Sequence, residues 1–131
     1  MRAVRSENTG PERVVRKLAH RLGYRFRLHR RDLPGTPDLV FPGRRKAIFV
    51  HGCFWHRHPH PDCPRGRSVP ATRTDYWEAK FARNVRRDRR AQRALRADGW
   101  GVMVVWECQT RPARLGRLAG RLRRFLGEPM G

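Results

Sequence analysis

The sequence predicts an α/β fold, and three observations indicate it. Segments with helical periodicity and short apolar runs typical of strands alternate in the order α-β-β-β-α-β, with one more helical segment at the C-terminus. A length of 131 residues fits one domain that buries roughly two thirds of the surface exposed by its unfolded chain. The sequence contains neither an internal repeat nor a linker. We therefore expect residues 1–131 to form a single domain.

The first half of the chain predicts one helix and three strands. Residues 9–12, Thr-Gly-Pro-Glu, form a capping-box pattern that begins a helix, and Gly23 ends it. Residues 24–29 alternate between apolar and polar side chains, which is typical of a half-buried strand. Further strands are expected at 38–41 and 46–50. The second of these is apolar on both faces, which predicts a central position in the sheet.

The second half predicts two helices, one strand and a long irregular segment. Residues 51–73 are rich in proline, histidine and arginine and show no periodicity, so we expect them to be functional or held by something other than a core. A helix is expected at 75–97 and a buried strand at 102–106. Residues 111–131 form a basic C-terminal helix extension. Its leucine spacing favours packing on the core, with phosphate contact and dimerisation as alternatives.

Charge dominates the composition. The chain has 31 lysines and arginines against 11 acidic residues, so its formal net charge is +20. Such a surface attracts a polyanion, and nucleic acid is the first expectation, ahead of an acidic membrane face. In a basic arm at 1–8, expected to be flexible, Arg2 and Arg5 are placed to enter a DNA minor groove. The sequence shows no membrane span and no secretory segment, which predicts a soluble cytoplasmic protein.

A histidine-rich loop carries candidate metal ligands. Cys53, His58 and Cys63 lie in it at equal spacings, and thiolates with imidazole are ligands that Zn²⁺ prefers. Cys108 follows the strand at 102–106, so it can complete a tetrahedral site if that strand neighbours the strand at 46–50. Spacing alone leaves His60 as an alternative to His58. The other interpretation is that Cys108 is a small core residue and that the histidines are solvated.

Asp38 is a candidate ligand for a catalytic Mg²⁺ ion. It opens a strand after a turn, and a carboxylate there can hold a metal that polarises a phosphodiester. The acid-x-lysine companion that nucleases usually carry is absent from the strand at 46–50. An aspartate after proline is also ordinary turn chemistry, so the residues alone leave both interpretations open.

Three aromatic residues lie near these candidates. Phe54 and Trp55 sit among the polar ligands of the loop, and Trp77 begins the long helix. Exposed rings there can wedge between base pairs, which costs least where pairing is already defective. The alternative for Trp77 is a core position on the apolar face of its helix.

Four segments together resemble a known family. They are Leu-Pro-Gly-Thr-Pro-Asp at 33–38, Phe-Val-His-Gly-Cys-Phe-Trp-His at 49–56, Pro-Ala-Thr-Arg-Thr at 70–74 and Val-Val-Trp-Glu-Cys at 104–108. In this order they resemble the very short patch repair (Vsr) DNA mismatch endonucleases. The resemblance implies a restriction-endonuclease-like core, double-stranded DNA as the substrate and a nick 5′ to the thymine of a T:G mismatch from deaminated 5-methylcytosine. A monomer suits such an asymmetric mismatch best.

The resemblance also implies roles for individual residues. The carboxylate of Asp38 and the backbone carbonyl of Val50 would bind the catalytic Mg²⁺. His56 would be the general base for the attacking water, and His51 would contact the scissile phosphate or its metal-bound waters. Glu12 would orient the histidine or a metal-bound water. The Cys/His set of the loop would bind a structural Zn²⁺, and the aromatic residues would insert beside the mismatch.

Alternatives remain at several positions. Glu12 also fits the capping box of its helix, and His56 is a second candidate for the zinc site. The stretch between His58 and Cys63 is longer than usual for the family, which keeps His60 open as a substitute ligand.

Other functional classes are a zinc-stabilised DNA-binding module without catalysis and a related nuclease for restriction or RNA processing. A carboxylate aimed at a phosphate argues against the first. The Phe-Trp pair and the stretch at 70–74 favour the mismatch nickase over the second.

Overall fold

The computed structural model describes residues 9–129. Its elements follow the expected order: α1 Gly10–Arg21, β1 Arg27–Leu28, β2 Leu39–Phe41, β3 Lys46–His51, α2 Thr74–Ala97, β4 Gly101–Trp106 and α3 Leu115–Leu126. Short 3-10 turns lie between them at Pro42–Arg44, Pro64–Gly66, Glu107–Thr110 and Pro112–Arg114. The expected basic arm, with Arg2 and Arg5, lies outside the described residues.

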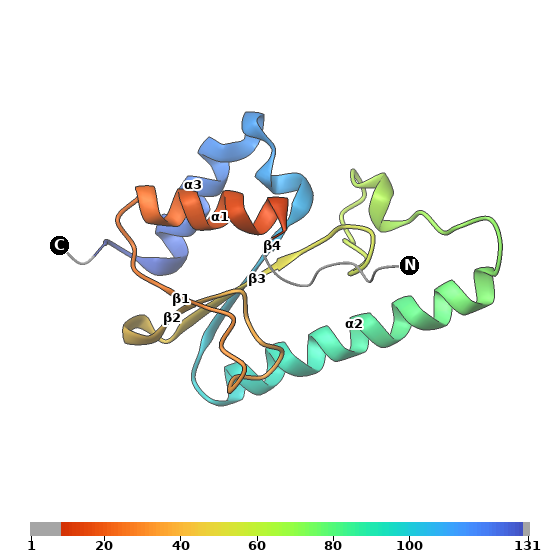
Figure 1. Ribbon diagram of the computed structural model, residues 1–131, viewed down its shortest axis with the longest axis horizontal. Coiled ribbons are helices and arrows are strands. Elements are labelled where there is room, and N and C mark those ends of the chain that lie inside the picture. The colour runs from red at the N-terminus through yellow and green to blue at the C-terminus, as the bar shows by residue number, and fades with distance from the viewer. Residues whose placement is uncertain (1–8, 130–131) are drawn as a thin grey trace.

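Within residues 9–129, four strands form one mixed sheet in the order β1-β2-β3-β4 (Figure 1). The first two pairings are antiparallel, whereas β3 and β4 run parallel from Lys46 beside Gly101 to His51 beside Trp106. β3 is therefore hydrogen-bonded on both sides, which confirms the central position predicted from its apolar sequence. Parallel neighbours need a crossover connection, and the loop after β3 together with α2 provides it.

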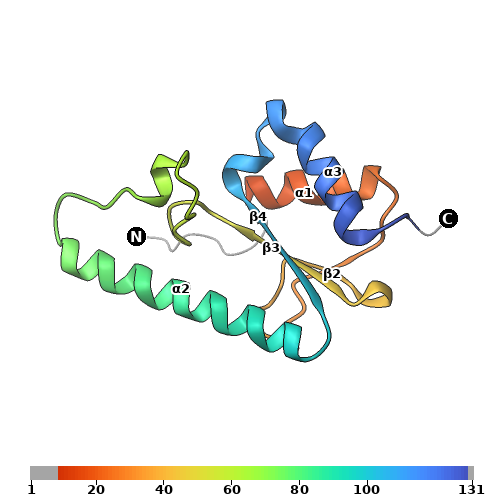
Figure 2. The ribbon, with the colours of Figure 1, turned by 180° about the vertical axis from the view of Figure 1, so that it is seen from behind.

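Helices cover both faces of the sheet (Figures 1 and 2). α1 and α3 lie together on one face, and α2 lies on the other. Successive side chains of a strand point to opposite faces, so β3 serves both cores. Ile48 is buried on the α1 and α3 side, whereas Ala47 and Phe49 are buried with Leu95 of α2. The N-terminal half of α2 extends past the sheet beside the loop that follows β3 (Figure 1).

α3 packs on the core, as its leucine spacing predicts. Leu118, Leu122 and Leu126 are buried together with Val15 and Ala19 of α1. Burying a leucine side chain contributes roughly 1.5–3 kcal/mol, so these three residues fix the helix to the core. No helix in the described part of the chain is both long and apolar enough to cross a membrane.

The first strand is shorter than the sequence predicts. The alternation over 24–29 indicates a half-buried strand, but β1 contains only Arg27 and Leu28, and both are exposed. Its partner β2 is itself only three residues long, so little of the segment has a strand to pair with. Tyr24 is buried as the alternation predicts, but it lies outside the strand and its hydroxyl donates to the carbonyl of Gly127.

Candidate active site and metal cluster

Asp38 lies immediately before β2, where the pairing of β2 with β3 ends. Its carboxylate accepts a hydrogen bond of 2.7 Å from the backbone N–H of Val50. In an extended strand the N–H and the C=O of one residue point to the same side, so the carbonyl of Val50 faces the same gap. The hairpin thus brings a carboxylate and a main-chain carbonyl together, and Mg²⁺ prefers oxygen ligands.

Glu12 of α1 and His29, which follows β1, join Asp38 in one cluster. Nε2 of His29 lies 2.6 Å from the carboxylate of Glu12 and 4.0 Å from that of Asp38. One ligand atom from each of the three residues lies within 4.8 Å of the others, so the group can hold a metal ion. The hydroxyl of Thr9 accepts the N–H of Glu12, so this glutamate belongs to the helix cap and to the cluster at once.

His29 was not among the residues expected at the site. Its backbone is left-handed, with a φ of 49°, and this ends the strand directly beside Asp38. The N–H of His29 donates to the carbonyl of Asp38 at 3.3 Å. In an antiparallel hairpin, the residue after the first strand lies beside the residue before the second. That rule is the signal that points to His29.

His51 and His56 form a second cluster with Asp88 of α2. The two imidazole rings stack with centroids 3.9 Å apart and planes 6° apart. Nδ1 of His56 lies 2.7 Å from the carboxylate of Asp88, which orients the ring. The structure thus places His56 in this group rather than in the cysteine cluster. Asp88 was also not expected at the site. The only sequence feature that sets it apart is that it is the single acidic residue among the arginines of 86–90.

Burial sets the charge states in these clusters. Burial raises the pKa of Asp38 to about 7; the hydrogen bond from Val50 lowers it, and the charge of Glu12 raises it further. Burial, and then the charge of His56, lowers the pKa of His51 to about 3, so that ring is neutral at pH 7. A cation beside Asp38 would favour its charged form.

Cys53, His58, Cys63 and Cys108 come together as the sequence predicts. One ligand atom from each lies within 4.8 Å of the others. Nδ1 of His58 is 3.7 Å from the sulfur of Cys53 and 3.5 Å from that of Cys108. All three cysteines are free thiols. Three sulfur atoms and one imidazole nitrogen are the donor set of a structural zinc site, so these residues fit that ion.

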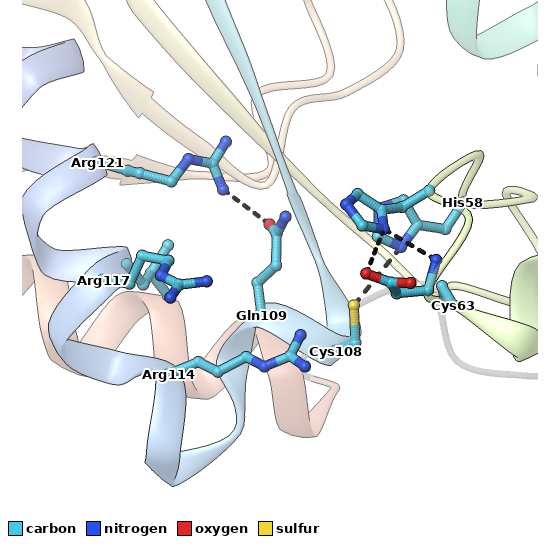
Figure 3. Close-up of a pocket in the computed structure, with 10 residues that line it drawn as sticks. His58, Cys63, Cys108, Gln109, Arg114, Arg117 and Arg121 are labelled. Carbon is cyan, nitrogen blue, oxygen red and sulfur yellow. Dashed lines mark hydrogen bonds and ion pairs between the residues drawn. The ribbon is translucent and has the colours of Figure 1, made fainter.

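His58, and not His60, belongs to this cluster. Figure 3 shows the contact between His58 and the sulfur of Cys108, and Cys63 belongs to the same group of candidate ligands. The side chain of His60 is 57% exposed, and its Nδ1 accepts the N–H of Asp62. The loop is closely folded around His58: a Cβ atom on Gly66 would lie 2.0 Å from the carbonyl oxygen of His58, so only glycine fits there.

Phe54, Trp55 and Trp77 pack together beside Phe81, between the loop and the N-terminal half of α2. The ring centroid of Phe54 lies 6.2 Å from that of Trp77 and 5.1 Å from that of Phe81. Trp55 lies 5.8 Å from Trp77. Phe81 is buried, whereas the other three rings are half-buried. Trp77 therefore packs on the apolar face of its helix and also contacts the aromatic pair of the loop.

The fold and these clusters define a class: a strongly basic α/β protein with a carboxylate–imidazole site next to a Cys/His cluster that could hold a metal ion. A family profile described as DNA mismatch endonuclease Vsr matches residues 1–64. The Type II nicking enzyme V.XorIIP of Xanthomonas oryzae pv. oryzae is 56% identical over 126 residues, which cover 96% of this chain and 88% of the relative.

Two more relatives agree. DNA mismatch endonuclease Vsr of Escherichia coli is 44% identical over 85% of this chain and 69% of its own length. Type II nicking enzyme V.NmeAIP of Neisseria meningitidis is 35% identical over 98% of this chain and 87% of its own length. The chain belongs to the Vsr family of DNA mismatch endonucleases, which confirms the resemblance seen in its motifs. It is a DNA endonuclease of the nicking type.

Proposed function

We propose that this enzyme nicks one strand of duplex DNA 5′ to the thymine of a T:G mismatch and so starts very short patch repair of deaminated 5-methylcytosine. Family membership supports a mismatch substrate and a single-strand cut. The observation that carries the proposal is the position of Asp38 between the backbone of Val50 and the Glu12–His29 pair. A cation at such a site can polarise a phosphodiester for hydrolysis, and an oriented imidazole comes from the neighbouring cluster.

Asp38 and the carbonyl of Val50 would hold a catalytic Mg²⁺ ion. When bound, this ion supplies a Lewis acid that polarises the phosphodiester and lowers the pKa of a water molecule. Glu12 would act through His29. Its carboxylate pairs with the ring of His29 and holds Nε2 of that ring 4.0 Å from the carboxylate of Asp38, the proposed metal ligand. The role expected for Glu12 is thus one of positioning.

His56 would accept the proton of the attacking water. Its hydrogen bond to Asp88 supports this role, since a carboxylate on one ring nitrogen fixes the ring and stabilises the charge gained with the proton. His51 would contact the scissile phosphate. It is neutral at pH 7 and stacks on His56, so it can donate a hydrogen bond without adding a second positive charge.

The Cys/His cluster would hold a structural Zn²⁺ ion. Its four protein donors complete a tetrahedral set, which is typical of structural rather than catalytic zinc. The loop after β3 has little core of its own, so the metal would replace hydrophobic burial as the source of its stability.

DNA recognition would use the half-buried aromatic residues. Phe54, Trp55 and Trp77 would enter the duplex beside the mismatch, where unstacking costs least, while Arg2 and Arg5 would follow the minor groove. The order of elements around the mixed sheet supports a restriction-endonuclease-like core in a single domain. We propose that one copy acts alone on an asymmetric mismatch, in the cytoplasm at the nucleoid.

A nicking assay tests this function. Each strand of a duplex with one central T:G mismatch is labelled and incubated with Mg²⁺ or with EDTA, beside a T:A duplex. We expect one Mg²⁺-dependent nick 5′ to the mismatched thymine. Equal cutting of the T:A duplex would instead indicate a related nuclease with another substrate, and binding without a cut would indicate a DNA-binding module.

A further inference from the structure

A basic cavity lies between the Cys/His cluster and α3. Its volume is about 260 Å³. Figure 3 shows Arg114, Arg117 and Arg121 on one side of it and His58 with Cys108 on the other. Nothing in the proposed reaction uses these arginines, and the packing of α3 uses its leucines instead.

Arg121 is built into this cavity. Its Nη1 donates to Oε1 of Gln109 at 2.8 Å, and the same oxygen accepts the N–H of Trp106 at 3.0 Å. The amide therefore holds the guanidinium in place at the end of β4. Arg121 is half-buried, and burial, followed by the charge of Arg124, lowers its pKa. A fixed cation in a desolvated position is stabilised when an anion approaches it.

The described residues supply little negative charge to balance these arginines. Within residues 9–129, neither Arg114 nor Arg117 has an ion pair or a side-chain hydrogen bond, and α3 carries no acid in its first turn. Asp62 lines the cavity, but its side chain is 89% exposed and lies 3.9 Å from His60. Glu107 lies nearby, but Arg65 donates to it at 3.2 Å.

We propose that Arg114, Arg117 and Arg121 form a subsite for a DNA backbone phosphate that lies outside the site of cleavage. The inference rests on the proposed action on duplex DNA. Guanidinium groups suit phosphate oxygens because their planar N–H groups bind them in pairs. The subsite adds affinity that is independent of sequence and lengthens the stretch of duplex that the enzyme holds.

Paired variants test the subsite. Arg114→Ala with Arg117→Ala removes two exposed arginines of the cavity. Arg21→Ala with Arg123→Ala removes the same charge from exposed positions of α1 and α3 that do not line this cavity. Binding of a T:G duplex is measured over a range of salt concentrations. We expect the cavity variant to bind about tenfold more weakly and to lose about one unit of the salt slope, and the control to lose clearly less.

A neutral methylphosphonate, placed at one backbone position at a time, locates the contact. At one position outside the cleavage site, the methylphosphonate should lower the affinity of the wild type but not that of the cavity variant. The loss of affinity from the methylphosphonate and the loss from the arginine substitutions are then not additive. Two results would overturn the proposal. One is an equal loss of affinity in the cavity variant and the control variant, and the other is that the effects of methylphosphonate and substitution are additive at every backbone position. These experiments measure binding, on T:A as well as T:G duplexes. They therefore test the phosphate subsite even if the proposed nicking activity is not found.

A competing role is charge balance for the metal cluster, since three thiolates and one Zn²⁺ carry a net charge of −1. Zinc content and melting temperature separate the two roles. We expect both to match the control variant. Loss of zinc from the cavity variant, with an unchanged salt slope, would assign the arginines to the metal cluster and reject the phosphate subsite.

Discussion

The two groups of side chains that flank the end of β3 are assembled in different ways. The Cys/His cluster takes three of its four candidate ligands from one loop and the fourth, Cys108, from the 3-10 turn that follows β4. The carboxylate–imidazole site draws on α1, the β1–β2 hairpin, the end of β3, the loop that follows it and α2. The Cys/His cluster is therefore assembled mostly within one loop, which a bound metal would stabilise, whereas the carboxylate–imidazole site is brought together by elements from the whole fold.

The two groups also differ in how they contribute to the free energy of unfolding. Thiolates and an imidazole around a cation satisfy one another, so a filled Cys/His cluster adds to the free energy of unfolding. Burial instead raises the pKa of Asp38 and lowers that of His51, so it disfavours the charged form of both side chains. We therefore expect substitutions in the first group to lower stability and some substitutions in the second to raise it.

The largest effect is expected on the rate of nicking. Asp38→Ala removes the proposed metal anchor and should lower single-turnover nicking by at least about a thousandfold, since metal binding supplies several kcal/mol of transition-state stabilisation. Affinity for the T:G duplex should stay largely intact. Nicking at the wild-type rate by this variant would remove Asp38 from the active site.

The next largest effect is expected on stability, from substitutions in the Cys/His cluster. Cys63→Ser or Cys108→Ser should lower the zinc content and reduce the melting temperature by about 10 °C, as for a loss of roughly 3 kcal/mol. Metal analysis and thermal unfolding check both values. A metal-free variant with wild-type stability would show that the cluster does not stabilise the loop.

An intermediate effect is expected at Asp88, where α2 meets the candidate active site. Asp88→Asn keeps the shape but removes the charge beside His56, so we expect single-turnover nicking to fall by roughly a hundredfold. Glu78→Gln is the matched control, because it removes an exposed acid from the same helix. Equal rates for the two variants would argue against a role for Asp88 in orienting the ring.

The smallest effect has the opposite sign. The pKa of Asp38 rises from 3.8 to about 7 on folding, so the folded protein holds this proton more tightly than the unfolded chain. That stabilisation is complete below pH 4 and is lost as the pH rises through 7. Without added Mg²⁺, Asp38→Asn should therefore melt several degrees higher than the wild type at pH 8 and at the same temperature at pH 4. Lower stability at pH 8 would contradict the raised pKa.

The sequence allowed the zinc-type cluster to be predicted almost completely, because its information is local. Cys53, His58 and Cys63 share one loop, and a single assumption of neighbouring strands adds Cys108. Only the choice between His58 and His60 required the structure, since it depends on how the loop folds around Gly66. The central place of β3 was equally predictable from its apolar run.

The partners in the active site were harder to find. His29 reaches the site because a left-handed residue ends β1, and Asp88 reaches it because α2 crosses beside the loop. Neither contact leaves a periodic pattern in the sequence. The short β1 shows the same limit, since its length depends on the strand opposite it rather than on its own alternation.

Only one residue separates the two groups within the loop. His56 faces Asp88, His58 faces the cysteines, and between them Arg57 has a left-handed backbone with a φ of 55°. Inserting or deleting one residue at Arg57 would misplace both histidines at once. Between His58 and Cys63 the chain is mostly exposed, so its length can change while both ends stay anchored. We therefore expect this loop to tolerate a change of length between His58 and Cys63 better than between His56 and His58.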